Sequence, residues 1–133
     1  MRLPEAEALR RLAEARVARL ATADADQPHL VPVTYVLHDG TITIAVDHKP
    51  KATRDLKRVR NIRANPNVSL LVDEYTEDWA RLWWVRVDGT ATVTAEPEPA
   101  LVEKYPQYQA NPPAGPFIRI RVERVVGWSF SRS

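Results

Sequence analysis

The stretch PHLVPVTYVLHDGTITIAVD, residues 28–47, decides the fold class. Its first arm, His29 to Leu37, is rich in β-branched residues, and its second arm alternates, with Ile42, Ile44 and Val46 on one face. Asp-Gly between two such runs is the strongest short-range signal of a β-hairpin. The sequence therefore predicts two antiparallel strands joined at Asp39-Gly40, the second with only one face buried.

Strand patterns continue on both sides of this hairpin. Arg81 to Val93 alternates over its whole length, and Gly89 inside it predicts a bulge or a close approach of another backbone or a ligand. Other predicted strands are 16–22, 68–72, 117–122 and about 125–130. These are too many strands for an open sheet, so we expect a barrel.

Three helices are predicted between the strands. The first follows Pro4 and ends near Ala15. The second spans Thr53 to Ala64, where apolar residues recur every third position and Asn65-Pro66 ends the pattern. The third spans Pro97 to Tyr108. The expected fold is mainly β with short helices, an α+β class, in a single domain covering residues 1–133.

Composition narrows the function classes. With 133 residues and 44% apolar content, the chain can specify one core. The absence of cysteine excludes disulfides, thiolate metal sites and thiol catalysis. No window approaches the roughly 20 apolar residues that a membrane-spanning helix needs, so we expect a soluble, cytoplasmic protein without a membrane partner.

The net charge of +2 conceals a concentrated basic segment. Seven cations lie within residues 49–63, and only Asp55 opposes them locally: Lys49, Lys51, Arg54, Lys57, Arg58, Arg60 and Arg63. A helix N-terminus, which Thr53 can cap, together with Lys and Arg can hold a phosphate. A solvated helix face is the alternative, but a polyanionic ligand would relieve the repulsion between like charges.

A second group of residues is aromatic. Trp83 falls on the apolar face of its strand, whereas Trp79 and Trp84 are placed where an interface or a ligand platform is expected. If the barrel closes, Tyr75 and these tryptophans would lie near Trp128 and the tyrosines of the third helix. Two outward tryptophans on so small a barrel suggest a dimer.

The sequence gives no sign of metal or nucleotide-loop chemistry. His29, His38 and His48 lack the spacing of metal ligands, so no metal site is expected. The patterns GxGxxG, GxxxxGK[ST] and GxSxG are absent. A nucleic-acid surface is disfavoured because the second half of the chain is net acidic and no recognition motif accompanies the basic segment.

The motif string resembles a known family over residues 17–130. Its parts are residues 28–47, then KPK, RVRNIRANPNVSLLVD, DWARLWWVRVDGTA, KYPQYQANPPAGPFIRIRV and GWSF. Together they are similar to the pyridoxamine 5′-phosphate oxidase-like superfamily of split β-barrels. Within it, the chain looks most like the actinobacterial oxidoreductases that depend on coenzyme F420, a deazaflavin.

The resemblance implies a homodimer with two cofactors in clefts between the subunits. The cofactor ring would lie against Pro32, Val33, Thr34 and Tyr35, largely through backbone groups. Asp47 ends the neighbouring strand, and Lys49 and Lys51 would meet the phosphate together with the helix beyond them. The family's lysine eight residues before the helix-ending proline is replaced here by Arg58, which leaves open whether Lys51 or Arg58 is the main phosphate ligand. Trp79 would cover the ring from the partner subunit.

The implied activity is hydride transfer between reduced F420 and a small organic acceptor. Such chemistry needs positioning and exclusion of water, not a covalent intermediate, so no catalytic residue is assigned. Tyr35 and Arg86 could donate to a substrate if they face the cleft. Two alternatives stay open: an FMN-binding oxidase or reductase of the pyridoxamine-phosphate oxidase type, and a cofactor carrier without turnover.

Overall fold

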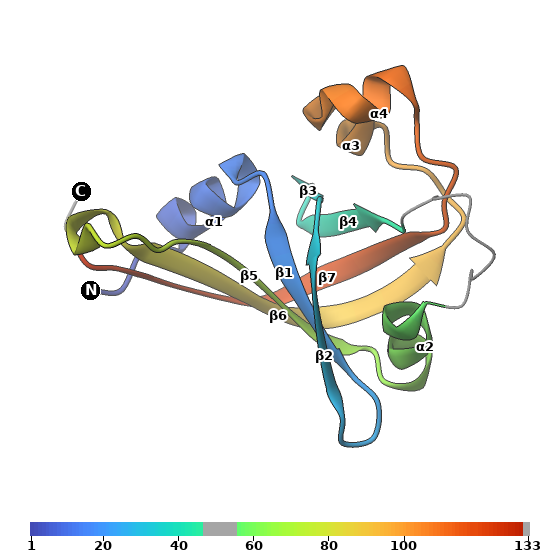
Figure 1. Ribbon diagram of the computed structural model, residues 1–133, viewed down its shortest axis with the longest axis horizontal. Helices are drawn as coiled ribbons and strands as arrows, with labels where there is room; N and C mark the ends of the chain where they lie inside the picture. The colour runs from blue at the N-terminus through green and yellow to red at the C-terminus, as the bar shows by residue number, and fades with distance from the viewer. Residues whose placement is uncertain (47–55, 132–133) are drawn as a thin grey trace.

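The computed structural model describes residues 1–46 and 56–131 (Figure 1). Within these residues, seven strands form one sheet in which every pair of neighbours is antiparallel, in the order β2-β1-β5-β6-β7-β4-β3. Along the chain the elements are α1 (Glu5–Glu14), β1 (Ala18–Ala23), β2 (Pro28–Val33), β3 (Val36–His38), β4 (Thr41–Ala45), α2 (Lys57–Ala64), β5 (Asn67–Glu74), the 3₁₀ turn η1 (Trp79–Arg81), β6 (Trp83–Thr94), α3 (Pro99–Lys104), α4 (Pro106–Ala110) and β7 (Phe117–Ser129).

The sheet curls because its two edges are neighbours in the chain. β2 and β3 are the outer strands of the order, yet only Thr34 and Tyr35 separate them. So short a link brings the two edges together, and the sheet becomes a half-barrel (Figure 1). The predicted class, mainly β with short helices in a split barrel, is confirmed. The single strand expected over His29 to Leu37 is wrong in one respect, since it breaks at Thr34 and Tyr35.

The Asp39-Gly40 hairpin is confirmed. Asp39 has φ 52° and Gly40 has φ 75°, the pair of positive values that a two-residue type I′ turn requires. β4, however, is covered on both faces: Thr43 is as buried as Ile42 and Ile44. The outward face of β4 packs in a second apolar cluster in which Ala45 meets Leu101 and Phe117. The prediction of a half-buried strand missed this layer, which α3 supplies.

β6 and β7 form the long spine of the sheet. They pair from Trp83 opposite Ser129 to Thr94 opposite Phe117, with one register shift between Asp88 and Gly89. The bulge predicted at Gly89 is thus confirmed, and a Cβ there would lie 2.2 Å from the Arg121 carbonyl oxygen. The two C-terminal strands expected from the sequence are one strand, because the ladder to β6 resumes on the far side of the shift.

One of the three predicted helices has the expected boundaries, and the other two are described differently by the structure. α1 matches its prediction and buries Ala8 and Leu12 in the main core of the half-barrel. α2 begins at Lys57 with Leu56 as its N-cap, and Thr53, the start and cap expected from the sequence, lies outside the described residues. The predicted third helix is divided into α3 and α4 at Tyr105, which is extended because Pro106 follows it. In the described part of the chain, no helix is long and apolar enough to cross a membrane.

Candidate functional site

A hollow of about 270 Å³ opens where β2 and β4 end. Residues from four parts of the chain form its wall: Pro32, Val33, Thr34, Ala45, Val46, Arg58 and Tyr108. We call it the Thr34 hollow. Four of the nine predicted cofactor-binding residues line it, namely Pro32, Val33, Thr34 and Arg58. Three others, Asp47, Lys49 and Lys51, lie outside the described residues.

Thr34 and Tyr35 form the break between β2 and β3, and Thr34 lines this hollow. Tyr105 fixes the backbone of Tyr35 by hydrogen bonds. The Tyr35 N–H donates to the Tyr105 hydroxyl at 3.1 Å. The same hydroxyl lies 2.9 Å from the carbonyl oxygens of Tyr35 and Arg16. Tyr105 therefore accepts a hydrogen bond from the Tyr35 N–H and donates its one proton to the Tyr35 or the Arg16 carbonyl, which ties the break to α3.

The side chain of Tyr35 belongs to the core. It is fully buried, and its hydroxyl donates to the Leu12 carbonyl near the end of α1. Burial raises the pKa of this hydroxyl well above its ordinary value. The sequence allowed Tyr35 to donate to a substrate only if it faced the cleft, and this condition is not met, since the hydroxyl is buried and bonded inside the protein.

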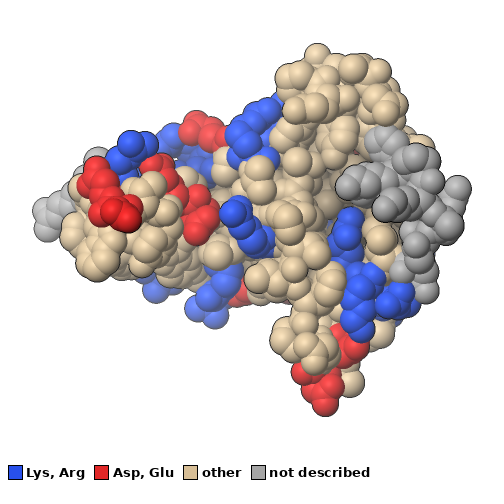
Figure 2. Space-filling model, viewed as in Figure 1, with Lys and Arg blue, Asp and Glu red and all other residues tan. Residues whose placement is uncertain are grey.

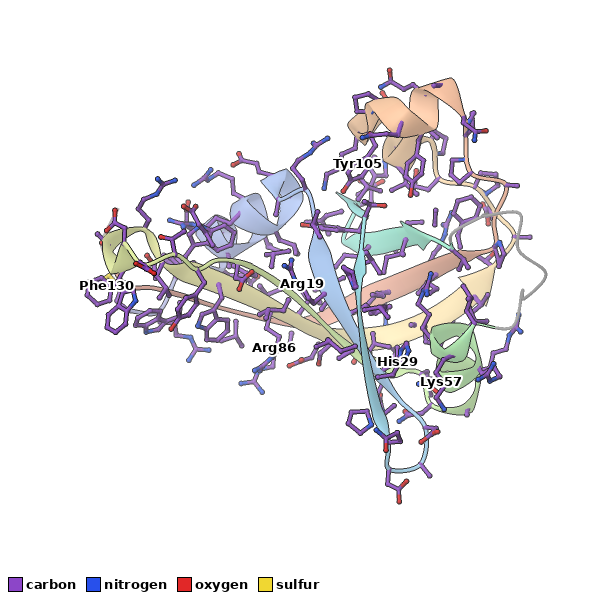
Figure 3. All side chains as sticks on the ribbon, in the orientation of Figure 1. Arg19, His29, Lys57, Arg86, Tyr105 and Phe130 are labelled. Carbon is purple, nitrogen blue, oxygen red and sulfur yellow. The ribbon has the colours of Figure 1, made fainter. Side chains whose placement is uncertain are left out.

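Lys104 and Arg16 surround the same tyrosines. The Lys104 ammonium donates to the Ala15 carbonyl at 2.8 Å, and the Arg16 guanidinium lies 4.8 Å from the centre of the Tyr105 ring. Burial, followed by the nearby charge of Arg16, lowers the pKa of Lys104 to about 8. Figure 3 shows Tyr105 between the α3–α4 segment and β3.

A hydroxyl pair forms part of the hollow wall. The Thr34 Oγ1 and the Tyr108 hydroxyl lie 2.8 Å apart, and either atom can be the donor. Tyr108 packs edge-on against Tyr105, with ring centres 5.6 Å apart. Tyr105 and Tyr108 were expected near the tryptophans, but they lie here instead. The KYPQY motif was visible in the sequence, yet its proximity to Thr34 depends on the fold.

The basic helix α2 presents Arg58 to the hollow. Its neighbour Lys57 instead forms a 2.8 Å ion pair with Asp24, from the turn after β1. This hydrogen bond is the main reason that the pKa of Asp24 is lowered. Lys57 therefore has an acidic partner distant in sequence, which the local charge count did not reveal. Figure 3 shows Lys57 on α2 near the β1–β2 hairpin.

Trp79 and Arg86 are not part of the Thr34 hollow. Trp79 lies in η1, 59% exposed, at the end of the molecule near the C-terminus and far from α2 (Figure 1). Trp84 and Trp128 pair across β6 and β7 at this same end. Arg86 donates to both carboxylate oxygens of Asp88, at 3.2 and 3.3 Å. One protomer thus does not bring all predicted site residues together.

The described residues hold no group of three or more acidic or histidine side chains suited to a metal ion. His29 lies in β2 and His38 in β3, while His48 falls outside the described residues.

Comparison with known proteins assigns the chain to a protein family. The family model described as pyridoxamine 5′-phosphate oxidase matches residues 4–129. This chain belongs to that family. No curated protein matches its sequence.

Solved structures share the fold of this family member. An FAD-binding protein from Mesorhizobium loti is 27% identical, with a TM-score of 0.71 over 96% of this chain and 95% of that one. A conserved hypothetical protein from Mycobacterium tuberculosis is 24% identical, with a TM-score of 0.73 over 96% and 85%. The FAD binding protein from Mycobacterium smegmatis is 20% identical, with a TM-score of 0.66 over 98% and 99%. The last two likenesses concern the fold alone.

Proposed function

We propose that this protein is an oxidoreductase that binds coenzyme F420 in the Thr34 hollow and transfers a hydride between the reduced cofactor and a small organic acceptor. The observation that carries the proposal is the composition of the hollow wall. Arg58 supplies a fixed positive charge, and the Thr34–Tyr108 pair supplies hydroxyl groups beside apolar Val33 and Val46. A phosphorylated ring cofactor needs this combination of charge, polar contacts and apolar surface.

Family membership and a neighbour described as FAD-binding both support a flavin-type ring. F420 is preferred over FMN because its tail of phospholactate and glutamates carries more negative charge, and the segment from Lys49 to Arg63 is strongly basic. We propose Lys49 and Lys51 as further phosphate ligands and place Asp47 beside them. The described part of the site fits the phosphate through Arg58, whose guanidinium forms paired hydrogen bonds with oxyanions.

When bound, the reduced cofactor supplies the hydride. The chain's own residues bind the cofactor and orient its ring. Pro32 and Val33 offer the edge of β2 to one side of the ring, and Tyr105 keeps the adjacent break rigid. Rigid placement of the hydride donor and acceptor, together with the exclusion of water, would accelerate the transfer.

A homodimer is part of this proposal. The hollow of about 270 Å³ lies at the small end of the roughly 300–1,000 Å³ typical of ligand pockets, and a surface from a second subunit would enclose a tricyclic ring more fully. The end of the molecule around η1 is acidic and aromatic, with Asp73, Glu77, Asp78 and exposed Trp79, whereas α2 is basic. Figure 2 shows acidic residues gathered at the first end, with some basic residues among them, and basic residues near the second. A two-fold arrangement would place the acidic aromatic end of each subunit against the basic end of the other.

The cofactor is tested by titrating the purified apo-protein with F420 and with FMN. We expect tighter binding of F420, and a tenfold or greater loss of its affinity in the Lys49→Ala, Lys51→Ala double variant with folding intact. Arg63→Ala, an exposed cation of the same basic segment, is the matched control. Much tighter binding of FMN would favour the FMN-dependent alternative.

Turnover requires a separate measurement. Reduced F420 is mixed with the protein and a panel of quinones, enones and tetrapyrroles, and its reoxidation is followed by absorbance. We expect hydride transfer to at least one acceptor. Binding without transfer to any member of the panel would favour the cofactor carrier.

A further inference from the structure

Tyr108 is the one described polar residue of the Thr34 hollow that the family resemblance did not assign to the cofactor. Its hydroxyl lies 2.8 Å from Thr34 Oγ1, and both side chains are half-buried and line the hollow. It comes from α4, whereas Thr34 lies in the link between β2 and β3 and Arg58 lies in α2.

We propose that Tyr108 binds the polar edge of the cofactor's pyrimidine ring, with Thr34 as its partner. This inference rests on the proposed function. F420 and FMN share that ring, whose edge presents a carbonyl, an N–H and a second carbonyl in succession. A hydroxyl pair matches such an edge, because one proton is used within the pair, the other remains to donate to a carbonyl, and the oxygen lone pairs accept the N–H.

The position of Tyr108 is fixed before any ligand arrives. Its N–H donates to the Tyr105 carbonyl at 3.0 Å, and its ring packs edge-on against that of Tyr105. Tyr105 is in turn bonded to both backbone groups of Tyr35. A hydroxyl held in this way loses little conformational freedom when a ring binds, which favours affinity and selectivity for the ring edge.

Riboflavin has the FMN ring but no phosphate, so it distinguishes binding of the ring from binding of the phosphate. We would measure Kd for riboflavin, FMN and F420 by fluorescence titration in the wild type, Tyr108→Phe and Thr34→Val. Removing the Tyr108 hydroxyl is expected to weaken riboflavin and FMN equally, by roughly fivefold to tenfold, the value of one hydrogen bond. Arg58→Ala is expected to weaken FMN and F420 but leave riboflavin unchanged, since that arginine faces the phosphate.

Thr92→Val is the control for loss of a threonine hydroxyl, because Thr92 lies exposed on β6 away from the hollow. Thermal melting of each variant separates binding from stability. A Tyr108→Phe protein that melts earlier but keeps wild-type Kd values for all three ligands would assign the hydroxyl pair a structural role only and overturn this inference. A wild type that binds none of the three ligands would instead overturn the proposed function, and this inference with it.

Discussion

The Lys104 ammonium lies 4.0 Å from the centre of the Tyr35 ring while donating a hydrogen bond to the Ala15 carbonyl. Arg16 completes the connection, since its Nη2 donates to the Lys104 carbonyl at 2.7 Å. The end of α1 is thereby joined to the end of α3, almost ninety positions away in the chain. This connection holds the α3–α4 segment, and with it Tyr108, against the break between β2 and β3.

Lys104 should give the protein a pH-dependent stability. Its pKa is lowered from 10.5 to about 8 by burial and by Arg16. The unfolded chain therefore binds more protons than the folded one between these two values, so the free energy of unfolding rises with pH across that window. We expect urea denaturation between pH 7.5 and 9.5 to show a steeper rise in the wild type than in Lys104→Met. Parallel curves would contradict this.

Tyr35 should contribute to stability and not to chemistry. Tyr35→Phe removes the donor to the Leu12 carbonyl and leaves that buried oxygen unsatisfied. We expect the free energy of unfolding to fall by about 1–3 kcal/mol, while cofactor affinity stays within twofold of the wild type. Tyr75→Phe, at a tyrosine that is 67% exposed, should change stability little. A large loss of cofactor affinity in a folded Tyr35→Phe protein would mean that the Tyr35 hydroxyl does contribute to cofactor binding.

Gly89 should tolerate no side chain. An alanine Cβ at this position would lie 2.2 Å from the Arg121 carbonyl oxygen, so β7 would have to move. We expect Gly89→Ala to lower the free energy of unfolding by at least about 2 kcal/mol in chemical denaturation. Gly40→Asn is the comparison, because Gly40 has a positive φ that asparagine accepts, and a Cβ added there would have no atom within 4 Å. Equal losses of unfolding free energy in the two variants would mean that the backbone relieves the contact at the bulge at little energetic cost.

The strands were predictable where a local rule determined them. Asp39-Gly40 fixes its own turn, and the thirteen-residue alternation around Gly89 fixes β6 and the bulge. The features that were predicted wrongly or missed depend on tertiary contacts. β4 is buried on both faces because α3, more than fifty residues later in the chain, covers Ala45. Tyr108 escaped prediction for the same reason, since nothing local relates it to Thr34. Arg58, which lines the hollow, could be singled out from the sequence because its charge and its position before Pro66 match the pattern of the family that the chain resembles.

Trp79 provides the test of the proposed dimer. It lies at the opposite end of the protomer from α2, so it can reach a cofactor only in the partner subunit (Figure 1). We expect Trp79→Ala to weaken F420 binding by about tenfold, the loss of one ring contact at a buried interface, in a protein that remains dimeric by light scattering. Phe130→Ala, which removes another exposed aromatic ring at the same end, is the control for a general effect on this surface.

Mixed dimers distinguish an action across the interface from an indirect one. A heterodimer of Trp79→Ala and Arg58→Ala subunits contains one site with both defects and one site with neither, if each site combines Arg58 of one subunit with Trp79 of the other. Random mixing should therefore restore wild-type affinity to about one site in four, a population that neither variant has alone. If Trp79 instead acted within its own subunit, every site in the mixture would keep at least one defect. Titration of the mixture with F420 would then show no high-affinity phase, and the proposed pairing of the acidic aromatic end with α2 would be wrong.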